Sequence, residues 1–324
     1  MNVSVQLRFI DVFNGDADGL CALRQLRLAA PCDAELITGT KRDIELLSRV
    51  QAAPNTVVTV LDISLARNRF ALDAMLAAGV RVRYFDHHFP GSIPTHANLE
   101  AHIDTAAEVC TSVIVDRMLN GRYRPWAITA AYGDNLLAIA ERLSDTQTLS
   151  LVERATLRTL GEAINYNAYG ETVADLHIHP ADLYRRMANF DSPFAFAAAE
   201  PIARELIALR ATDLAAALGV TPTVADATST LYQLPDAPWS RRVLGTMAHH
   251  LASSDPKRAH AVLAPNRDGS YAVSVRGSAG ARVSAHAVCV PFGGAGRHGA
   301  AGIDRLDAAA VASFIASFQS TRWT

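Results

Sequence analysis

Carboxylate and imidazole side chains recur at four points in the first half of this 324-residue chain. They occur as Asp16-Ala17-Asp18, Asp62, Asp86-His87-His88 and Asp134. Carboxylates that pack closely repel one another, and a bound cation relieves that repulsion. Carboxylate oxygens combined with one or two imidazoles suit Mn²⁺ or Mg²⁺, and Mn²⁺ accepts this mixed ligation more readily than Mg²⁺ does. The residue types therefore predict a manganese centre, with Mg²⁺ as the alternative ion.

The first three of these groups each follow a run of residues that favours a β-strand. We expect strands over 7–13, 56–63 and 80–85, and the apolar spacing predicts helices over 20–28 and 65–76. This alternation is typical of a parallel sheet flanked by helices, in which ligands gather at the carboxyl ends of the strands. A single aspartate after a strand often only caps a helix or forms a turn. The prediction of a shared site therefore rests on all three groups together, with Asp134 completing the cluster from a helical run.

The length and composition predict two globular domains. A chain of 324 residues exceeds the roughly 100–200 residues of one domain, and half of its residues are hydrophobic. We expect an α/β protein with an N-terminal parallel sheet flanked by helices, a helical connector and a smaller C-terminal α/β domain. The sheet domain is placed at 1–145, the connector and linker at 146–237, and the C-terminal domain at 238–324. Within the connector, the segment 219–237 is rich in Thr and Ala and is interpreted as the linker.

The charge and cysteine content exclude several classes of protein. A formal net charge of -2 argues against the large basic surface that binding of long duplex nucleic acid requires. The four cysteines lie far apart and form no Cys-x-x-Cys pair, which argues against a thiol-rich metal site. No apolar run reaches the roughly 18 residues of a membrane helix. We therefore expect a cytoplasmic enzyme with a short nucleotide substrate and no membrane partner, and a homodimer is left open.

In their order along the chain, the acidic and histidine motifs resemble the four motifs of the DHH phosphoesterases. This family includes oligoribonucleases, cyclic-dinucleotide phosphodiesterases, RecJ-type single-strand exonucleases and family II pyrophosphatases. The resemblance spans residues 11–135. A second resemblance covers roughly 240–320, where a glycine-rich segment at 292–302 is similar to the signature of the DHH-associated substrate-binding domain. That segment disfavours the pyrophosphatases, whose second domain is of a different type.

The family resemblance implies a role for each matching position. Asp62 would bridge two metal ions, and Asp16 would bind the first of them. The second ion would be bound by Asp18, His87 and Asp134. His88 would act beside the substrate phosphate, so His88 and Asp62 are the expected catalytic residues. The expected substrate-binding residues are Asn14, Arg276, Gly294, Gly296, Arg297 and His298.

Two positions depart from the family pattern. Many members have a histidine ligand for the first metal ion four residues before Asp16, where this chain has Val12. Asn14 is the nearest polar side chain, and the resemblance therefore implies a weakened first metal site. In the glycine-rich segment the usual histidine aligns with Arg297, and His298 is displaced by one residue. The sequence leaves open which of these two side chains contacts the substrate phosphate.

These observations predict a manganese-dependent phosphodiesterase that hydrolyses short oligonucleotides or dinucleotides, linear or cyclic. Two divalent ions about 3.5–4 Å apart would activate a water and neutralise charge on the phosphoryl group. Two alternatives stay open. One is a RecJ-like single-strand exonuclease, which the missing basic groove disfavours. The other is a non-catalytic nucleotide-binding protein with a degenerate first metal site. The sequence does not distinguish among individual substrates, their lengths or the oligomeric state.

Overall fold

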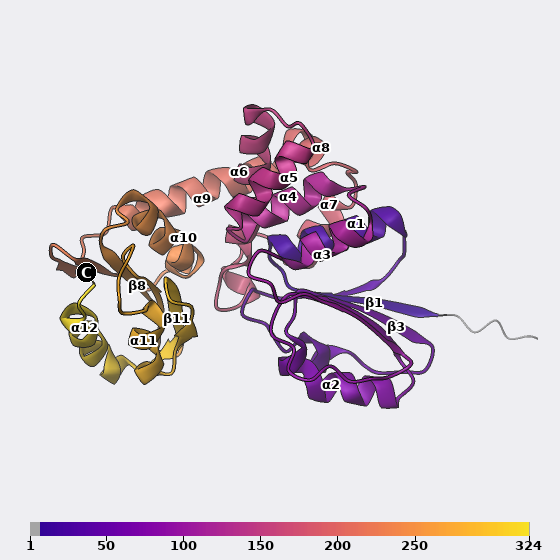
Figure 1. The fold of residues 1–324 in the computed structure, drawn as a ribbon, viewed down its shortest axis with the longest axis horizontal. Coiled ribbons are helices and arrows are strands. Elements are labelled where there is room, and N and C mark those ends of the chain that lie inside the picture. Colours follow the sequence, from indigo (N-terminus) through magenta and orange to yellow (C-terminus); the bar gives the residue numbers. More distant parts are fainter. Residues whose placement is uncertain (1–6, 324) are drawn as a thin grey trace, which may run out of the picture. The chain divides into compact units, whose positions relative to one another are not determined.

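A five-stranded parallel sheet organises the first half of the chain in the computed structural model, which describes residues 7–323 (Figure 1). The strand order is β2-β1-β3-β4-β5, and every neighbouring pair is parallel. The strands are β1 (Arg8–Phe13), β2 (Glu35–Ile37), β3 (Thr56–Leu61), β4 (Arg81–Asp86) and β5 (Leu99–Ile103). The predicted parallel sheet is therefore confirmed. Its two edge strands were not predicted, because they are short or carry charged side chains in place of an apolar run.

Helices cover both faces of this sheet. Figure 1 shows α2 on one face and α1, α3 and the following helices on the other. The α-helices of this first unit are α1 (Ala17–Ala29), α2 (Leu65–Ala77), α3 (Thr111–Met118), α4 (Arg124–Gly133), α5 (Leu137–Thr146), α6 (Leu151–Ala168), α7 (Pro180–Met187) and α8 (Pro193–Ala199). Two short 3₁₀ helices, η1 (Leu46–Arg49) and η2 (Val173–Asp175), interrupt the loops.

Two apolar layers hold the sheet between its helices. Phe13 packs with Leu20 of α1 and Trp126 of α4 in one cluster of buried residues. Ile10 and Val12 belong to the other cluster, with side chains of α2 and β3. Successive residues of a strand point to opposite faces, so β1 contributes to both layers. The alternation explains why the central strands are apolar along their whole length.

A second unit forms around a six-stranded sheet. It comprises Tyr169–Glu171 and the residues from 208 onward. The strand order is β10-β11-β9-β8-β7-β6, and only β7 and β8 pair in parallel. Its strands are β6 (Val224–Ala225), β7 (Ser229–Gln233), β8 (Ala259–Pro265), β9 (Tyr271–Arg276), β10 (Ala295–Gly296) and β11 (Ala300–Leu306). Its helices are α10 (Pro238–Ser254), α11 (Ala285–Cys289), η3 (Val290–Phe292), η4 (Ala308–Ala310) and α12 (Val311–Ser320).

The middle of the chain differs from the predicted connector. Its helices up to α8 contribute Leu160, Leu183 and Phe196 to the core of the first unit. Helix α9 (Pro201–Leu218) begins in the first unit and ends in the second. The segment 219–237, interpreted as a linker, instead contains β6 and β7, and Leu231 of β7 is fully buried. Mixed polar residues hid these short strands, of which β7 is stabilised by pairing with β8 and β6 by pairing with β7.

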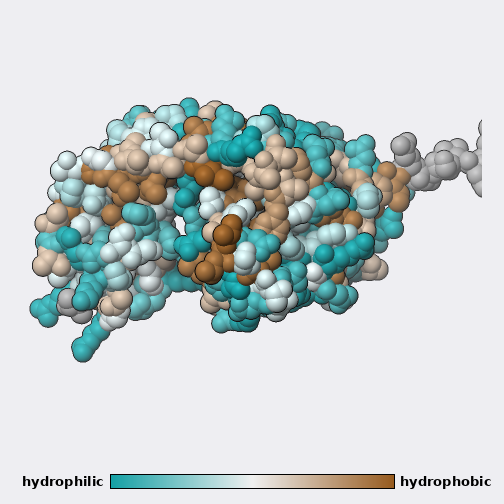
Figure 2. Space-filling view, turned by 90° about the horizontal axis from the view of Figure 1, so that it is seen from above, coloured by the Kyte–Doolittle hydropathy of each residue, from teal (hydrophilic) through white to brown (hydrophobic). Residues whose placement is uncertain are grey.

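Polar side chains dominate much of the surface. Figure 2 shows hydrophilic side chains over most of the viewed face, with smaller groups of hydrophobic ones among them. Across residues 7–323, none of the helices has both the length and the apolar character that a membrane crossing needs.

Two glycines bring helices α4 and α6 into backbone contact. A Cβ atom on Gly161 would lie 2.1 Å from the carbonyl oxygen of Thr129, and one on Gly133 would lie 2.5 Å from Cβ of Ala17. Gly133 directly precedes Asp134, and Ala17 lies between Asp16 and Asp18. This close approach therefore sets the position of Asp134 beside the first acidic motif.

We predict that Gly161→Ala destabilises the first unit by about 1–3 kcal/mol, because the added methyl group forces two backbones apart. This cost exceeds the roughly 1 kcal/mol that alanine gains over glycine in a helix. Urea denaturation measures the change. Thr159→Ala, an exposed site on the same helix, is the control and should change the free energy of unfolding by less than about 0.5 kcal/mol. Equal stability of both variants would contradict the backbone contact.

Candidate metal centre

The acidic motifs meet at the carboxyl edge of the parallel sheet. Asp16 follows β1 and caps α1, Asp62 follows β3, and Asp86 is the last residue of β4. All three side chains belong to residues that are at most 2% exposed. Asp134 joins them as the residue that ends α4. Because neighbouring parallel strands end at the same edge, the sequence order brings these groups together.

The two oxygens of Asp16 have different roles. Its Oδ1 accepts hydrogen bonds from the backbone N–H groups of Asp18 (3.0 Å) and Gly19 (3.1 Å), which caps helix α1. Its Oδ2 lies 2.5 Å from Nζ of Lys41. The helix-capping interpretation of this aspartate is thus correct for one oxygen, and the other oxygen points to a cation.

Asp18 ties α1 to the start of α3. Its Oδ1 accepts from the backbone N–H of Ser112 and its Oδ2 from that of Thr111, each at 2.7 Å. These N–H groups belong to the first turn of α3, where no intrahelical partner exists and where negative charge is favourable. Each carboxylate oxygen keeps a further lone pair, so Asp18 is able to bind a metal ion while it holds the helix.

Asp62 is the most strongly perturbed carboxylate of the centre. Burial raises its pKa well above the usual range, and the neighbouring charges of Asp16, Asp18 and Asp134 raise it further. Its backbone has a φ of 60°, in the left-handed region that Asn and Asp tolerate better than most residues. A cation beside Asp62 would favour its ionised form.

The histidine pair is positioned by Asp86. Oδ1 of Asp86 accepts from the backbone N–H of His87 (2.9 Å) and lies 2.7 Å from Nδ1 of His88. Burial lowers the pKa of His88, but the hydrogen bond and the charge of Asp86 outweigh it, so the pKa is raised overall. The contact holds Nδ1 and leaves Nε2 of the half-exposed His88 for other partners.

Asp62, His87 and His88 form a set of donors that fits a divalent ion. Each offers one ligand atom, and these atoms all lie within 4.8 Å of one another. Nε2 of His87 is 3.4 Å from Oδ1 of Asp62. Two ligand atoms that are each about 2.1 Å from one ion would be separated by a similar distance. One carboxylate oxygen with two imidazole nitrogens is a donor set that Mn²⁺ accepts.

Lys41 is the residue of this centre that sequence analysis missed. Its Nζ lies 2.5 Å from Oδ2 of Asp16 and 3.3 Å from Oδ1 of Asp134. Burial favours a higher pKa for Asp16, but the charge and hydrogen bond of Lys41 outweigh burial and lower the pKa. Burial and the charges of Asp18 and Asp16 still raise the pKa of Asp134. Lys41 lies in no recognisable motif, although it is one of only two lysines, with Lys257, among 30 basic residues.

Val12 and Asn14 both make contacts within the protein that stabilise the fold. Val12 is fully buried in the apolar layer beside α2. Oδ1 of Asn14 accepts from the backbone N–H of Asp16 (3.2 Å), and its Nδ2 donates to the carbonyl of Lys41 (3.5 Å). Asn14 thus connects the loop after β1 to the loop that carries Lys41, and its assignment to substrate binding stays a prediction.

The remaining predicted residues lie in the second unit, around a tight hairpin. Residues 297–299 connect β10 to β11, and Arg297 and His298 are both exposed there. Gly296 has a φ of 150°, and a Cβ on Gly294 would lie 2.5 Å from the carbonyl oxygen of Gly302. Arg276 ends β9, opposite Ala300 in the register of the sheet. The fold therefore places Arg276 next to the hairpin that carries both candidate phosphate ligands.

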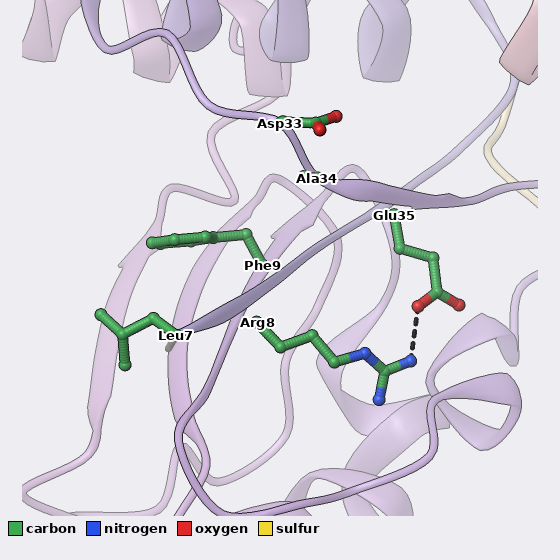
Figure 3. A pocket seen from close by; sticks show the side chains of 6 residues that line it. All are labelled: Leu7, Arg8, Phe9, Asp33, Ala34 and Glu35. Atoms are coloured by element: carbon green, nitrogen blue, oxygen red, sulfur yellow. Dashed lines mark hydrogen bonds and ion pairs between the residues drawn. The ribbon is translucent and has the colours of Figure 1, made fainter. Parts of the chain in front are cut away.

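One cavity of about 490 Å³ lies away from the carboxylates of the metal centre. It is lined by Leu7, Arg8, Phe9 and the segment 33–35 (Figure 3). These residues are at the amino ends of β1 and β2, opposite the edge where the carboxylates meet. Figure 3 shows the ion pair between Arg8 and Glu35 at this cavity. The cavity therefore has no part in the metal centre.

The fold matches solved structures of known proteins. RecJ from Thermus thermophilus in complex with Mn²⁺ aligns with 97% of this chain, at a TM-score of 0.63 and 19% identity. A second RecJ structure, bound to manganese, aligns with 97% of this chain and 89% of its own, at 0.58 and 18%. PggH, the pGpG-specific phosphodiesterase from Vibrio cholerae, aligns with 98% of this chain and 100% of its own, at 0.55 and 13%. No protein-family model and no curated protein matches the sequence.

This chain has a fold like that of RecJ and PggH. The resemblance predicted from the four acidic and histidine motifs is thereby confirmed at the level of the fold. The chain spans about half the length of the Thermus RecJ chain, 51%. The match covers both the five-stranded parallel sheet and the six-stranded sheet of the second unit.

We predict that Asp62→Asn weakens Mn²⁺ binding by at least about 100-fold, because a neutral amide replaces a carboxylate ligand. Asn tolerates the left-handed backbone, and loss of one buried charge relieves repulsion, so the metal-free variant should be at least as stable as the wild type. Asp62→Ala should lose about 1 kcal/mol more, since alanine is strained at this φ. Isothermal titration calorimetry and thermal unfolding in EDTA measure both effects. Unchanged Mn²⁺ affinity in Asp62→Asn would exclude Asp62 as a ligand.

A separate prediction concerns Asp18. Asp18→Ala removes the acceptor of two buried N–H groups and should lower the free energy of unfolding by about 2 kcal/mol or more. Asp18→Asn keeps one acceptor oxygen and should cost about half as much. Urea denaturation in EDTA separates this structural effect from metal binding. Similar stability of the two variants would show that the contacts to α3 contribute little.

Proposed function

We propose that this chain is a manganese-dependent phosphodiesterase that hydrolyses short oligonucleotides or dinucleotides, linear or cyclic. The observation that carries the proposal is the grouping of Asp62, His87 and His88, in which Asp62 and His87 could hold an ion with His88 beside it, at an edge where four carboxylates are collected. The RecJ-like fold, seen in manganese-bound RecJ and in a pGpG-specific phosphodiesterase, supports it. Cytoplasmic location and a homodimer stay predictions from the sequence.

The residues of the first unit would have different roles in hydrolysis. Hydrolysis joins a water oxygen to phosphorus and breaks one P–O ester bond, and the leaving oxygen must take up a proton. His88, whose Nδ1 is held by Asp86 at 2.7 Å, would supply that proton from Nε2. The hydrogen bond and the charge of Asp86 raise the pKa of His88 and so favour its protonated form. A bound divalent ion would supply an activated water and neutralise phosphoryl charge. Asp62 and His87 would hold that ion, with Asp18 and Asp134 beside it.

The second unit would anchor the substrate. Arg297 and His298 are exposed at the tip of the β10–β11 hairpin, and Arg276 lies next to it. A planar guanidinium binds phosphate through two parallel hydrogen bonds, which favours Arg297 over His298 as the phosphate ligand. Glycines such as Gly294 and Gly296 allow the backbone N–H groups to approach an anion closely. We propose that these residues bind a phosphate group of the substrate.

Two observations favour short substrates over long strands. The net charge of -2 offers few cations to a long phosphate backbone. PggH, which is specific for pGpG, aligns along its whole length with this chain. A RecJ-like single-strand exonuclease is the second candidate, since two RecJ structures share the fold. The buried Val12 supports the third, a nucleotide-binding protein without turnover.

The test is a product-resolved assay with Mn²⁺ on linear substrates from dinucleotides to about 20 nucleotides, together with cyclic dinucleotides. We expect turnover that falls with length and that Asp62→Asn lowers at least about 1,000-fold, as loss of a metal ligand should. Turnover that rises with length would favour the exonuclease. Tight nucleotide binding without any turnover that depends on Asp62 would favour the non-catalytic protein.

A further inference from the structure

Lys41 places a positive charge between two of the predicted metal ligands. Its Nζ lies 2.5 Å from Oδ2 of Asp16 and 3.3 Å from Oδ1 of Asp134, and its side chain is only 28% exposed. Oδ2 is the oxygen of Asp16 that does not cap α1. A metal ion bound by this oxygen would therefore compete with the ammonium group of Lys41 for the same place.

The loop that carries Lys41 is built into the centre. The backbone N–H of Lys41 donates to the carbonyl of Ala168 (2.9 Å), and its own carbonyl accepts from Asn14. A Cβ on Gly15 would lie 2.0 Å from the carbonyl oxygen of Gly39, so the loops after β1 and β2 touch through their backbones. These contacts fix the backbone of the loop, from which the side chain of Lys41 reaches Asp16 and Asp134.

A second contact network stiffens the same loop. Oδ2 of Asp43 accepts from the backbone N–H (2.8 Å) and the hydroxyl (3.2 Å) of Thr40, and its Oδ1 accepts from Arg49 (2.8 Å). Thr40, which precedes Lys41, is only 1% exposed. The loop is therefore fixed on both sides of the lysine.

The first metal position also lacks a ligand. Val12 occupies the position from which the family resemblance implies a histidine, and it is fully buried among apolar side chains of β1, β3 and the helices beside them. An ion at Asp16 would find no imidazole there and would face the ammonium of Lys41. The donors that remain, Asp62 and His87, are 3.4 Å apart and fit a single ion.

We propose that the ammonium group of Lys41 takes the place of the first metal ion, so that the centre holds one divalent ion. The inference deepens the proposed function and rests on it for the presence of that ion. An ammonium group neutralises charge and donates hydrogen bonds to phosphoryl oxygens as a metal ion does, but it binds no hydroxide. Lys41 would therefore stabilise charge on the phosphoryl group, and water activation would belong to the single ion.

The experiment counts bound Mn²⁺ in the full chain by equilibrium dialysis with elemental analysis, and reads its magnetic environment by electron paramagnetic resonance. We expect one Mn²⁺ per wild-type chain with the spectrum of an isolated ion. Lys41→Met, which keeps the length of the stem and removes the charge, should bind a second ion and show a spin-coupled pair. Lys257→Met removes the charge of the other, exposed lysine and should match the wild type.

Lys41→Arg keeps the positive charge, and this variant should still bind one Mn²⁺. If Lys41→Met does not fold, Lys41→Gln takes its place as the neutral variant. Two ions in the wild type would overturn the inference, and so would a single ion in both neutral variants. The outcomes also separate the inference from the proposed function. One bound ion without phosphodiester hydrolysis would contradict only the function, whereas no bound Mn²⁺ in the wild type would contradict both.

Discussion

Repulsion between buried carboxylates governs the edge of the sheet where the centre lies. Burial, together with the charges of Asp16, Asp18 and Asp134, raises the pKa of Asp62 well above its usual range. Such a cluster is stable only if positive charge or hydrogen-bond donors are supplied. The protein supplies both: N–H groups at the starts of α1 and α3, and the ammonium of Lys41. The negative charge that these groups do not balance lies around Asp62 and His87, where a divalent ion fits.

The same acids organise the packing of the first unit. Asp16 caps α1 and Asp18 holds the first turn of α3, so two helices are anchored by the groups that form the centre. The close approach of Gly133 in α4 to Ala17 in α1 brings Asp134, the next residue, beside the first acidic motif. Geometry of the site and stability of the unit therefore depend on the same contacts, and a substitution there affects both.

The fold alone leaves the chemistry undecided, because related folds host different activities on sites of different detail. RecJ and a pGpG-specific phosphodiesterase share the fold at identities below 20%. The features of this chain that bear on its chemistry are local: Lys41 beside Asp16, Val12 in the apolar layer, and Arg297 with His298 at the hairpin tip. Each of them alters the charge that a phosphate would meet.

The sequence by itself determined the parallel sheet, the order of the acidic motifs and the fold class. Apolar strand runs and the aspartates that follow them are local patterns, which can be read within a short window of the sequence. It did not reveal the edge strands, or β6 and β7 in the supposed linker, since short strands owe their stability to neighbours far along the chain. Nor did it indicate Lys41, which lies 25 residues from Asp16 and 93 from Asp134. Only the tertiary structure places a side chain from an unremarkable loop between two carboxylates, because that contact depends on how the loops after β1 and β2 pack together.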